Sequence, residues 1–165
     1  GTEPWENSTA SIIGNPLRWD GEDQCFKAWD DTKGGIAYAT SADGLSWEKP
    51  NLGIVEVDGS TPNNLILPGR NLSVIVDDRE TDPARRYKRM YRHSRRDPEM
   101  PWNGKGHFVP FSADGIPWED HADNPVTGFG NALTDGQDVL GWDELTPGTS
   151  PTCDPVCAAS TRRAA

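Results

Sequence analysis

The sequence predicts an all-β fold of short antiparallel strands, and three observations lead to this prediction. The 165 residues include 17 Gly and 14 Pro, which favour turns and leave little room for long helices. Short segments such as 35–40 have the alternating, aromatic-bearing pattern of a strand with one buried face. One eight-residue segment also occurs twice, so the fold is expected to consist of similar units.

The repeated segment predicts a tight turn in each unit. Segment 41–48 (SADGLSWE) returns 71 residues further along the chain as segment 112–119 (SADGIPWE). Glycine accepts a positive φ at such a turn, and the preceding aspartate can accept hydrogen bonds from the turn's own amides. The Trp of each copy is expected to cover the neighbouring strand. We therefore interpret Asp43 and Asp114 as structural residues.

The segments before the two copies correspond as well, and each unit is expected to hold four strands. Segment 25–29 of the first unit matches 86–91 of the second. The strands of the second unit are predicted at about 72–77, 86–92, 106–112 and 117–119. Four-stranded antiparallel units with a turn aspartate and a packed Trp are typical of the blades of a β-propeller.

The predicted β-propeller is incomplete, with about two and a half blades within residues 1–144. The blades are expected at about 10–50, with a first strand at Ile12 and Ile13, at about 72–122 and, as the start of a third, at about 138–143. Residues 145–165 lack alternation, and we expect them to form a disordered tail. Blade edges without partners favour a homodimer through these edges, or a truncated chain that a longer parent completes.

The charge of the chain excludes several classes of partner. Asp and Glu number 26 against 16 Lys and Arg, and the resulting net charge of -10 repels nucleic acid and anionic lipid. No apolar run approaches the roughly 20 residues of a membrane-spanning helix, so no membrane association is expected. The three Cys residues have no nearby His and indicate neither a disulfide framework nor a zinc site. We expect no metal and no cofactor.

Half of the basic residues lie in one short stretch, 79–96. Strand alternation predicts that Arg86 and Lys88 point to one side of the sheet and that Tyr87 and Arg89 point to the other. Long basic side chains can line the interface between blades and pair there with the abundant acids. We interpret the stretch as a source of structural salt bridges, with anion binding as the alternative.

Several motifs together resemble one family of propeller enzymes. They are YATSxDGxxWEKPNLG at 38–53, the pair Asn63 and Asn64, DPxxRYK at 82–88, and NPV at 124–126. Over about residues 4–144 the chain is similar to the five-bladed propellers of the arabinanase, levansucrase and invertase superfamily, especially its glycosidase-like members. This resemblance implies a protein that binds and hydrolyses a glycan, or a truncated relative of such an enzyme, and it slightly favours a secreted or periplasmic location. A non-catalytic propeller module that binds glycan or protein is the alternative.

The resemblance also implies where the sugar site lies. In this family it lies at the mouth of the axial channel, and glycoside cleavage needs one protonated and one ionised carboxyl group. The candidate catalytic residues are the carboxylates that precede the innermost strands, namely Glu6, Asp135 and Asp138. The link between the units offers amides and a guanidinium instead, which bind hydroxyl groups. The candidate substrate-binding residues are Trp5, Asn63, Asn64, Asn71, Arg92, Trp102 and Gln137.

Overall fold

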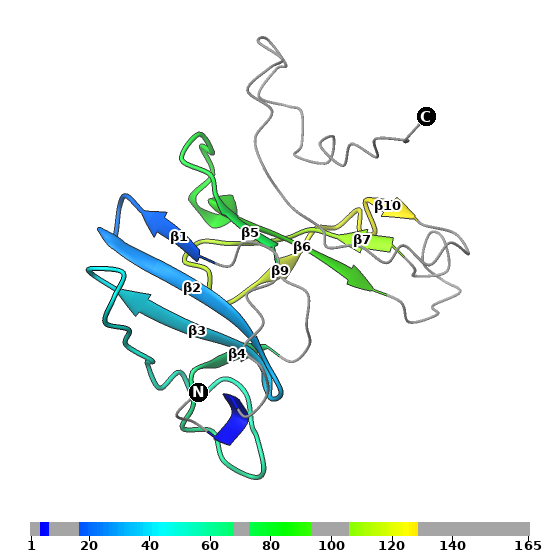
Figure 1. Ribbon diagram of the computed structural model, residues 1–165. Helices are drawn as coiled ribbons and strands as arrows, with labels where there is room; N and C mark the ends of the chain where they lie inside the picture. The colour runs from blue at the N-terminus through cyan, green and yellow to red at the C-terminus, as the bar shows by residue number, and fades with distance from the viewer. Residues whose placement is uncertain (1–3, 7–16, 68–72, 94–105, 129–165) are drawn as a thin grey trace, which may run out of the picture.

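The chain forms two antiparallel β-sheets (Figure 1). The computed structural model describes residues 4–6, 17–67, 73–93 and 106–128. In these residues the all-β prediction is confirmed, because the only helical segments there are two 3-10 turns, η1 (Pro4–Glu6) and η2 (Pro83–Arg85). This part of the chain contains no helix that is long and apolar enough to span a membrane.

The first sheet contains four strands in chain order. They are β1 (Leu17–Asp20), β2 (Cys25–Thr32), β3 (Gly35–Ser41) and β4 (Leu65–Leu67). The strand expected at Ile12 and Ile13 lies outside the described residues, and β1 is the first strand within them. The strand β4 lies beyond residue 50, where the first unit was expected to end, and pairs with the start of β3.

The second sheet is centred on one long strand. Its strands are β5 (Ser73–Val76), β6 (Tyr87–His93), β7 (Gly106–Phe108), β8 (Pro110–Ser112), β9 (Glu119–Asp120) and β10 (Thr127–Gly128). The central strand β6 pairs with β5 along one side and with both β7 and β8 along the other. The strands expected at 72–77, 86–92 and 106–112 are thus confirmed, the last of them as two short strands, and the fourth lies at 119–120.

The sequence repeat is also a repeat of backbone pairing. Thr40 in the first sheet pairs with Glu48, and 71 residues further along the chain Phe111 pairs with Glu119. In both units the chain therefore turns after the third strand, and the residues after the turn pair antiparallel with that strand.

In each unit, an asparagine from the segment after the Asp-Gly turn bonds the backbone of the third strand. The Nδ2 of Asn64 donates to the carbonyl oxygen of Tyr38 at 2.7 Å. At the equivalent place in the second unit, Asn124 accepts from the amide of Val109 at 2.9 Å and donates to its carbonyl oxygen at 3.4 Å. The two asparagines therefore serve the same structural role at the same strand position.

Both predicted Asp-Gly turns are confirmed. Gly44 and Gly115 have φ of 75° and 88°, a region that favours glycine. The Oδ1 of Asp43 accepts the amides two and three positions further on, each at 2.8 Å. The Oδ1 of Asp114 accepts the amide two positions further on at 2.9 Å. Both carboxylates therefore stabilise their own turns.

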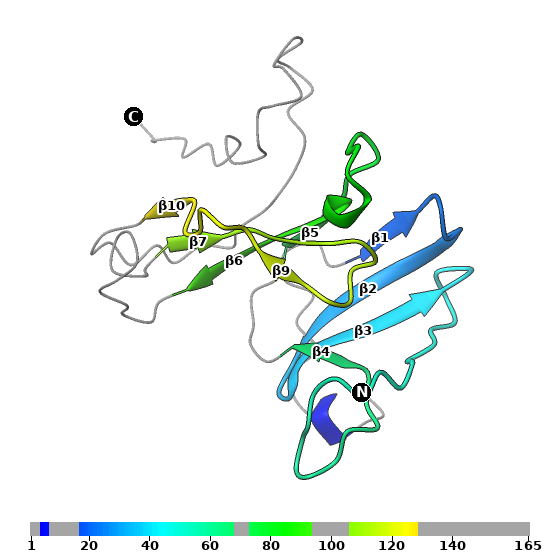
Figure 2. The same ribbon diagram turned by 180° about the vertical axis from the view of Figure 1, so that it is seen from behind.

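The two sheets pack face to face on a shared core (Figures 1 and 2). This core consists of Trp29, Ile36, Tyr38 and Ile66 from the first sheet and Val74 and Tyr87 from the second. The Nε1 of Trp29 donates to the carbonyl oxygen of Gly115 at 2.7 Å, which ties the turn of one unit to the centre of the other. In both views β7 and β10 lie at the end of the second sheet that is remote from the first.

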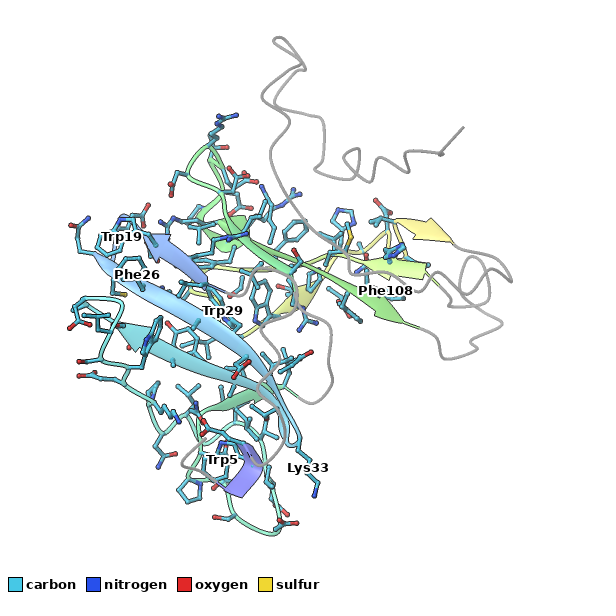
Figure 3. The ribbon with its side chains drawn as sticks, viewed as in Figure 1. Trp5, Trp19, Phe26, Trp29, Lys33 and Phe108 are labelled. Atoms are coloured by element: carbon cyan, nitrogen blue, oxygen red, sulfur yellow. The ribbon has the colours of Figure 1, made fainter. Side chains whose placement is uncertain are left out.

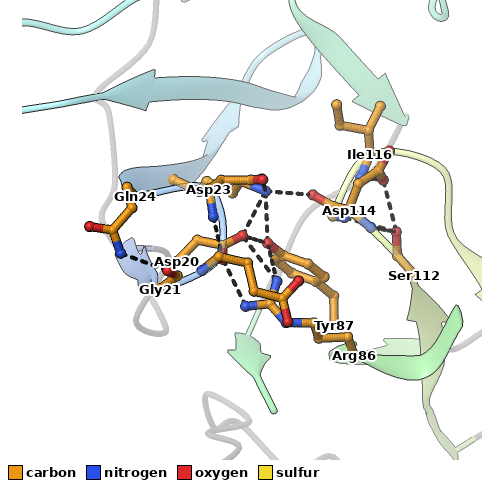
Figure 4. Close-up of polar contacts among 12 residues, drawn as sticks. Asp20, Gly21, Asp23, Gln24, Arg86, Tyr87, Ser112, Asp114 and Ile116 are labelled. Carbon is orange, nitrogen blue, oxygen red and sulfur yellow. Dashed lines mark hydrogen bonds and ion pairs between the residues drawn. The ribbon is translucent and has the colours of Figure 1, made fainter. Parts of the chain in front are cut away.

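Buried charged side chains also join the sheets (Figure 4). Asp20, at the end of β1, is fully buried and lies 2.7 Å from Nη2 of Arg86 and 2.9 Å from Nζ of Lys27. The hydroxyl of Tyr87 donates to the same carboxylate. Burial alone would raise the pKa of Asp20, but the hydrogen bonds from Arg86, Tyr87 and Lys27 hold it far below its usual range.

The second unit contains a similar charged group. Lys88 is buried and pairs with Asp77 and, at 2.8 Å, with Glu80. In the first unit Lys27 pairs with Asp20 and, at 2.6 Å, with Asp23. The structural salt bridges predicted for the basic stretch are thus confirmed for Lys88, as they are for Arg86.

The predicted side of Arg86 was wrong. Its side chain reaches Asp20 on the same side as Tyr87, rather than the side of Lys88. Arg86 follows η2 and has helical φ and ψ of -57° and -37°, so strand alternation begins one residue later, at Tyr87.

Candidate functional site

The predicted site residues Trp5, Glu6, Asn63 and Asn64 lie at one end of the first sheet. Trp5 and Glu6 belong to η1, and the two asparagines immediately precede β4. Figure 3 shows Trp5 at the same end as Lys33, which lies in the hairpin between β2 and β3. The Asp43 turn follows the opposite end of β3.

Trp5 is fixed against this hairpin by contacts on two sides. Its Nε1 donates to Oδ1 of Asn64 at 3.0 Å. A Cβ added to Gly34 would lie 2.9 Å from Cβ of Trp5 and 3.0 Å from Cδ1 of Leu65. Only glycine therefore fits between the indole and β4, and the half-buried ring of Trp5 is held in one place.

The side-chain amides of Asn63 and Asn64 are bonded within the protein. Nδ2 of Asn63 donates to the carbonyl oxygen of Val55 at 2.7 Å, and its Oδ1 accepts from the amide of Leu65 at 3.0 Å. Asn64 binds Trp5 and the backbone of β3 in the same way. Both side chains are buried, so their main observed role is to hold the loop that carries the site.

Two carboxyl groups at this end have different surroundings. Both oxygens of Glu6 face Nζ of Lys49, at 2.7 and 2.8 Å, so Glu6 has a cationic counter-charge. Asp30 lies near the end of β2, and its Oδ1 is buried without a hydrogen-bond partner in the described part of the chain. Asp31 follows it directly and adds a third carboxyl group.

The environment of Asp30 favours its protonated form. Burial raises the pKa of Asp30, and the negative charges of Asp31 and Glu6 raise it further. A hydrogen bond from the backbone and the charge of Lys49 act in the opposite direction but do not cancel these effects. The site thus combines one carboxyl group whose pKa is raised with one that is ion-paired.

Sequence analysis missed Asp30 and Asp31 as candidate catalytic residues. The available signal was their position at the end of a strand, directly before the turn formed by Lys33 and Gly34. This turn belongs to the same end as Trp5, so acids that flank it were also candidates.

Of the remaining predicted site residues, Arg92 alone lies within the described part of the chain. Arg92 lies in β6 of the second sheet, where its backbone pairs with His107. The other five lie outside the described residues, and these are Asn71, Trp102, Asp135, Gln137 and Asp138. Within the described residues, no group of three or more His, Cys, Asp or Glu side chains is arranged to hold a metal ion.

No family model, no curated protein and no solved structure matches the chain. The functional assignment therefore depends on the chemistry of the chain's own side chains.

Proposed function

We propose that the chain is a carbohydrate-active, glycoside hydrolase-like protein built from the blades of an incomplete β-propeller. The fold supports this proposal because an antiparallel unit repeats in sequence, the pairing across its Asp-Gly turn recurs 71 residues further on, and the two sheets share one core. We place the sugar site at the hairpin end of the first sheet, beside Trp5, Glu6 and Asp30.

One observation carries the assignment to glycoside chemistry. Asp30 has a raised pKa, and its negative neighbour Glu6 is ion-paired with Lys49. A glycosidase needs a carboxyl group that donates a proton to the leaving oxygen and an ionised carboxylate that acts as base or nucleophile. Asp30 suits the first role and Glu6 the second. Asp135 and Asp138 remain candidates for a further carboxylate.

The neighbouring side chains suit a sugar ligand. The indole of Trp5 is half-buried and held by Asn64, so it offers a fixed ring on which the C–H face of a sugar can stack. Lys49 supplies a donor, and the carboxylate oxygens of Glu6 supply acceptors, for hydroxyl groups.

A turnover assay with matched variants tests the proposal. The full chain is incubated with arabino-, fructo- and xylo-oligosaccharides, and newly formed reducing ends are measured. Loss of a general acid or of its partner lowers turnover by about 100-fold or more, so we expect this loss for Asp30→Asn and for Glu6→Gln. Asp43→Asn, at the opposite end of β3, should retain activity. Binding without turnover by the wild type would instead indicate a non-catalytic module, and equal losses in all three variants would contradict the assigned site.

An incomplete propeller also favours a homodimer. Leu17 and Trp19 of β1 are each 45% exposed, and Leu45 in the turn after β3 is 86% exposed, so this unit presents apolar side chains to solvent. A second copy of the chain would cover such side chains and pair free strand edges. Sedimentation equilibrium of the full chain tests this, and a monomer at all concentrations would contradict it.

A further inference from the structure

Four side chains of the second unit lie close together. Arg89 and Tyr91 are two positions apart on β6, Asp120 lies in β9, and Trp118 directly precedes that strand. The guanidinium carbon of Arg89 lies 4.5 Å from the centre of the Tyr91 ring and 5.4 Å from that of Trp118. The hydroxyl of Tyr91 donates to Asp120 at 3.2 Å. The four side chains therefore form one continuous group, here named the Arg89 patch.

Arg89 is the unusual member of this patch. It is only 7% exposed, and its Nε is buried without a hydrogen-bond partner in the described residues. In the same part of the chain it forms no ion pair, although buried guanidinium groups normally have an acid partner. Burial lowers the pKa of Arg89 to about 10, so it still carries its charge near neutral pH. Its guanidinium group contacts two aromatic rings.

The rings around Arg89 are held in place by the fold. The Nε1 of Trp118 donates to the carbonyl oxygen of Gly115 at 3.1 Å, and the indole packs against the core between the sheets. The ring of Tyr91 lies 5.4 Å from that of Phe108, which Figure 3 labels on the neighbouring strand. Asp120, in contrast, is exposed. The patch thus combines fixed aromatic rings with a carboxylate that solvent can reach.

The first unit shows that the fold itself does not require this set. At the position equivalent to Arg89 it has Ala28, and at the position equivalent to Asp120 it has Lys49. Only the Trp is shared, as Trp47. The same strands therefore form in the first unit without the guanidinium and the carboxylate.

The chemistry of the patch fits a neutral sugar. Guanidinium donors and carboxylate acceptors together bind adjacent hydroxyl groups, and an indole or phenol ring packs against the C–H groups of the same ring. An anion would be repelled by Asp120 and by the net charge of -10. We propose that Arg89, Tyr91, Trp118 and Asp120 form a second saccharide-binding site, which takes a neutral sugar with adjacent hydroxyl groups and is distinct from the site at Glu6 and Asp30.

Titration calorimetry on the full chain tests this site. The probes are neutral arabino-, fructo- and xylo-oligosaccharides, with oligogalacturonate and sulfate as anionic probes. Asp30→Asn serves as the parent protein, so that no probe is hydrolysed. We expect affinity to fall by about tenfold or more in Asp120→Asn, which removes a charged acceptor, and in Trp118→Ala, which removes the stacking ring. Trp47→Ala is the matched control and should bind as the parent does.

Each possible result supports or overturns the proposed second saccharide-binding site. Weaker binding by Asp120→Asn, with an unchanged melting temperature, would support the site even if Trp118→Ala failed to fold, because Asp120 is exposed. Absence of binding to every neutral probe, or equal losses in Trp118→Ala and Trp47→Ala, would overturn it. Binding of the anionic probes alone would show an anion site instead. If Asp30→Asn binds neutral sugars more weakly than the wild type does, and Asp120→Asn causes no further loss, the result would support the Glu6 site and overturn a site at the Arg89 patch.

Discussion

Lys27 donates to the hydroxyl of Tyr87 at 2.7 Å, although the two residues are 60 positions apart and belong to different sheets. Both are buried, and the ammonium also lies 4.8 Å from the centre of the Tyr87 ring. Asp20 contacts both side chains, so the bond is part of a charged group that contains its own counter-charge. The two sheets are therefore joined by polar contacts as well as by the apolar core.

Replacing Lys27 should strongly destabilise the protein. Lys27→Met leaves Asp20 buried with one cation fewer, and removal of one partner from a buried charge pair costs about 3 kcal/mol or more. We expect this loss in the free energy of unfolding, measured with urea. The control is Lys33→Met in the exposed hairpin, which should change stability by less than about 0.5 kcal/mol. Similar losses in both variants would contradict a specific role for the buried lysine.

Glu80 should make stability depend on acid pH. The hydrogen bond from Lys88 lowers the pKa of Glu80 from 4.5 to about 2. A carboxyl group with a lowered pKa stabilises the fold above its ordinary pKa, and this contribution is lost as the pH falls through the lowered value. Glu80→Gln should therefore be less stable than the wild type near pH 7, and the difference should shrink between about pH 4.5 and about pH 2. A difference that is constant over this range would show that Glu80 acts without its charge.

Gly115 and Gly59 allow the effect of crowding to be separated from that of backbone conformation. Their φ values are similar, 88° and 79°. A Cβ at Gly115 would lie 2.5 Å from Cζ2 of Trp29, whereas a Cβ at Gly59 would meet nothing within 4 Å. Gly59→Ala should cost about 1 kcal/mol for its positive φ, and Gly115→Ala should cost about 1–3 kcal/mol more because the indole must move. Equal melting temperatures for the two variants would contradict the close packing of Trp29.

The short-range features of the fold could be predicted from the sequence. Both Asp-Gly turns depend on residues within four positions of each other, and the alternation along β6 is local as well. The strand β4 was not predicted, because 65–67 is an uninterrupted apolar run without alternation and pairs with a distant strand. Local pattern contains no information on such pairing.

The candidate site was predicted only in part, because some of its properties depend on residues that are distant in the sequence. Trp5 and Asn64, both named as candidate substrate-binding residues, lie at one end of the first sheet and form a hydrogen bond although they are 59 positions apart. The raised pKa of Asp30 could not be predicted, because it depends on burial and on the distant charge of Glu6. The contact of Asp20 with Arg86 was missed because the helical backbone of Arg86 turns its side chain away from the strand pattern.

Asp30 should make the protein less stable as the pH rises, opposite in sign to Glu80. Burial raises the pKa of Asp30 above its ordinary value of 3.8, so the folded state binds the proton more tightly than the unfolded state. The protonated group stabilises the fold below pH 3.8, and this contribution is lost as the pH rises through the raised value. Asp30→Asn removes the charge, so the variant should be more stable than the wild type at neutral pH while it loses glycoside turnover.

Urea unfolding of wild type and Asp30→Asn between about pH 3 and about pH 7 measures this effect, with the advantage of the variant growing as the pH rises. Asp43→Asn is the control of opposite sign. Backbone hydrogen bonds from Ser46 and Leu45 lower the pKa of Asp43, so its variant should be the less stable protein at neutral pH and should approach the wild type in acid. A variant that is more stable but less active is expected where a carboxyl group is buried to serve catalysis. A neutral-pH stability of Asp30→Asn below that of the wild type would show that the charge of Asp30 is compensated in the fold, and Asp30 would then not be suited to serve as the acid.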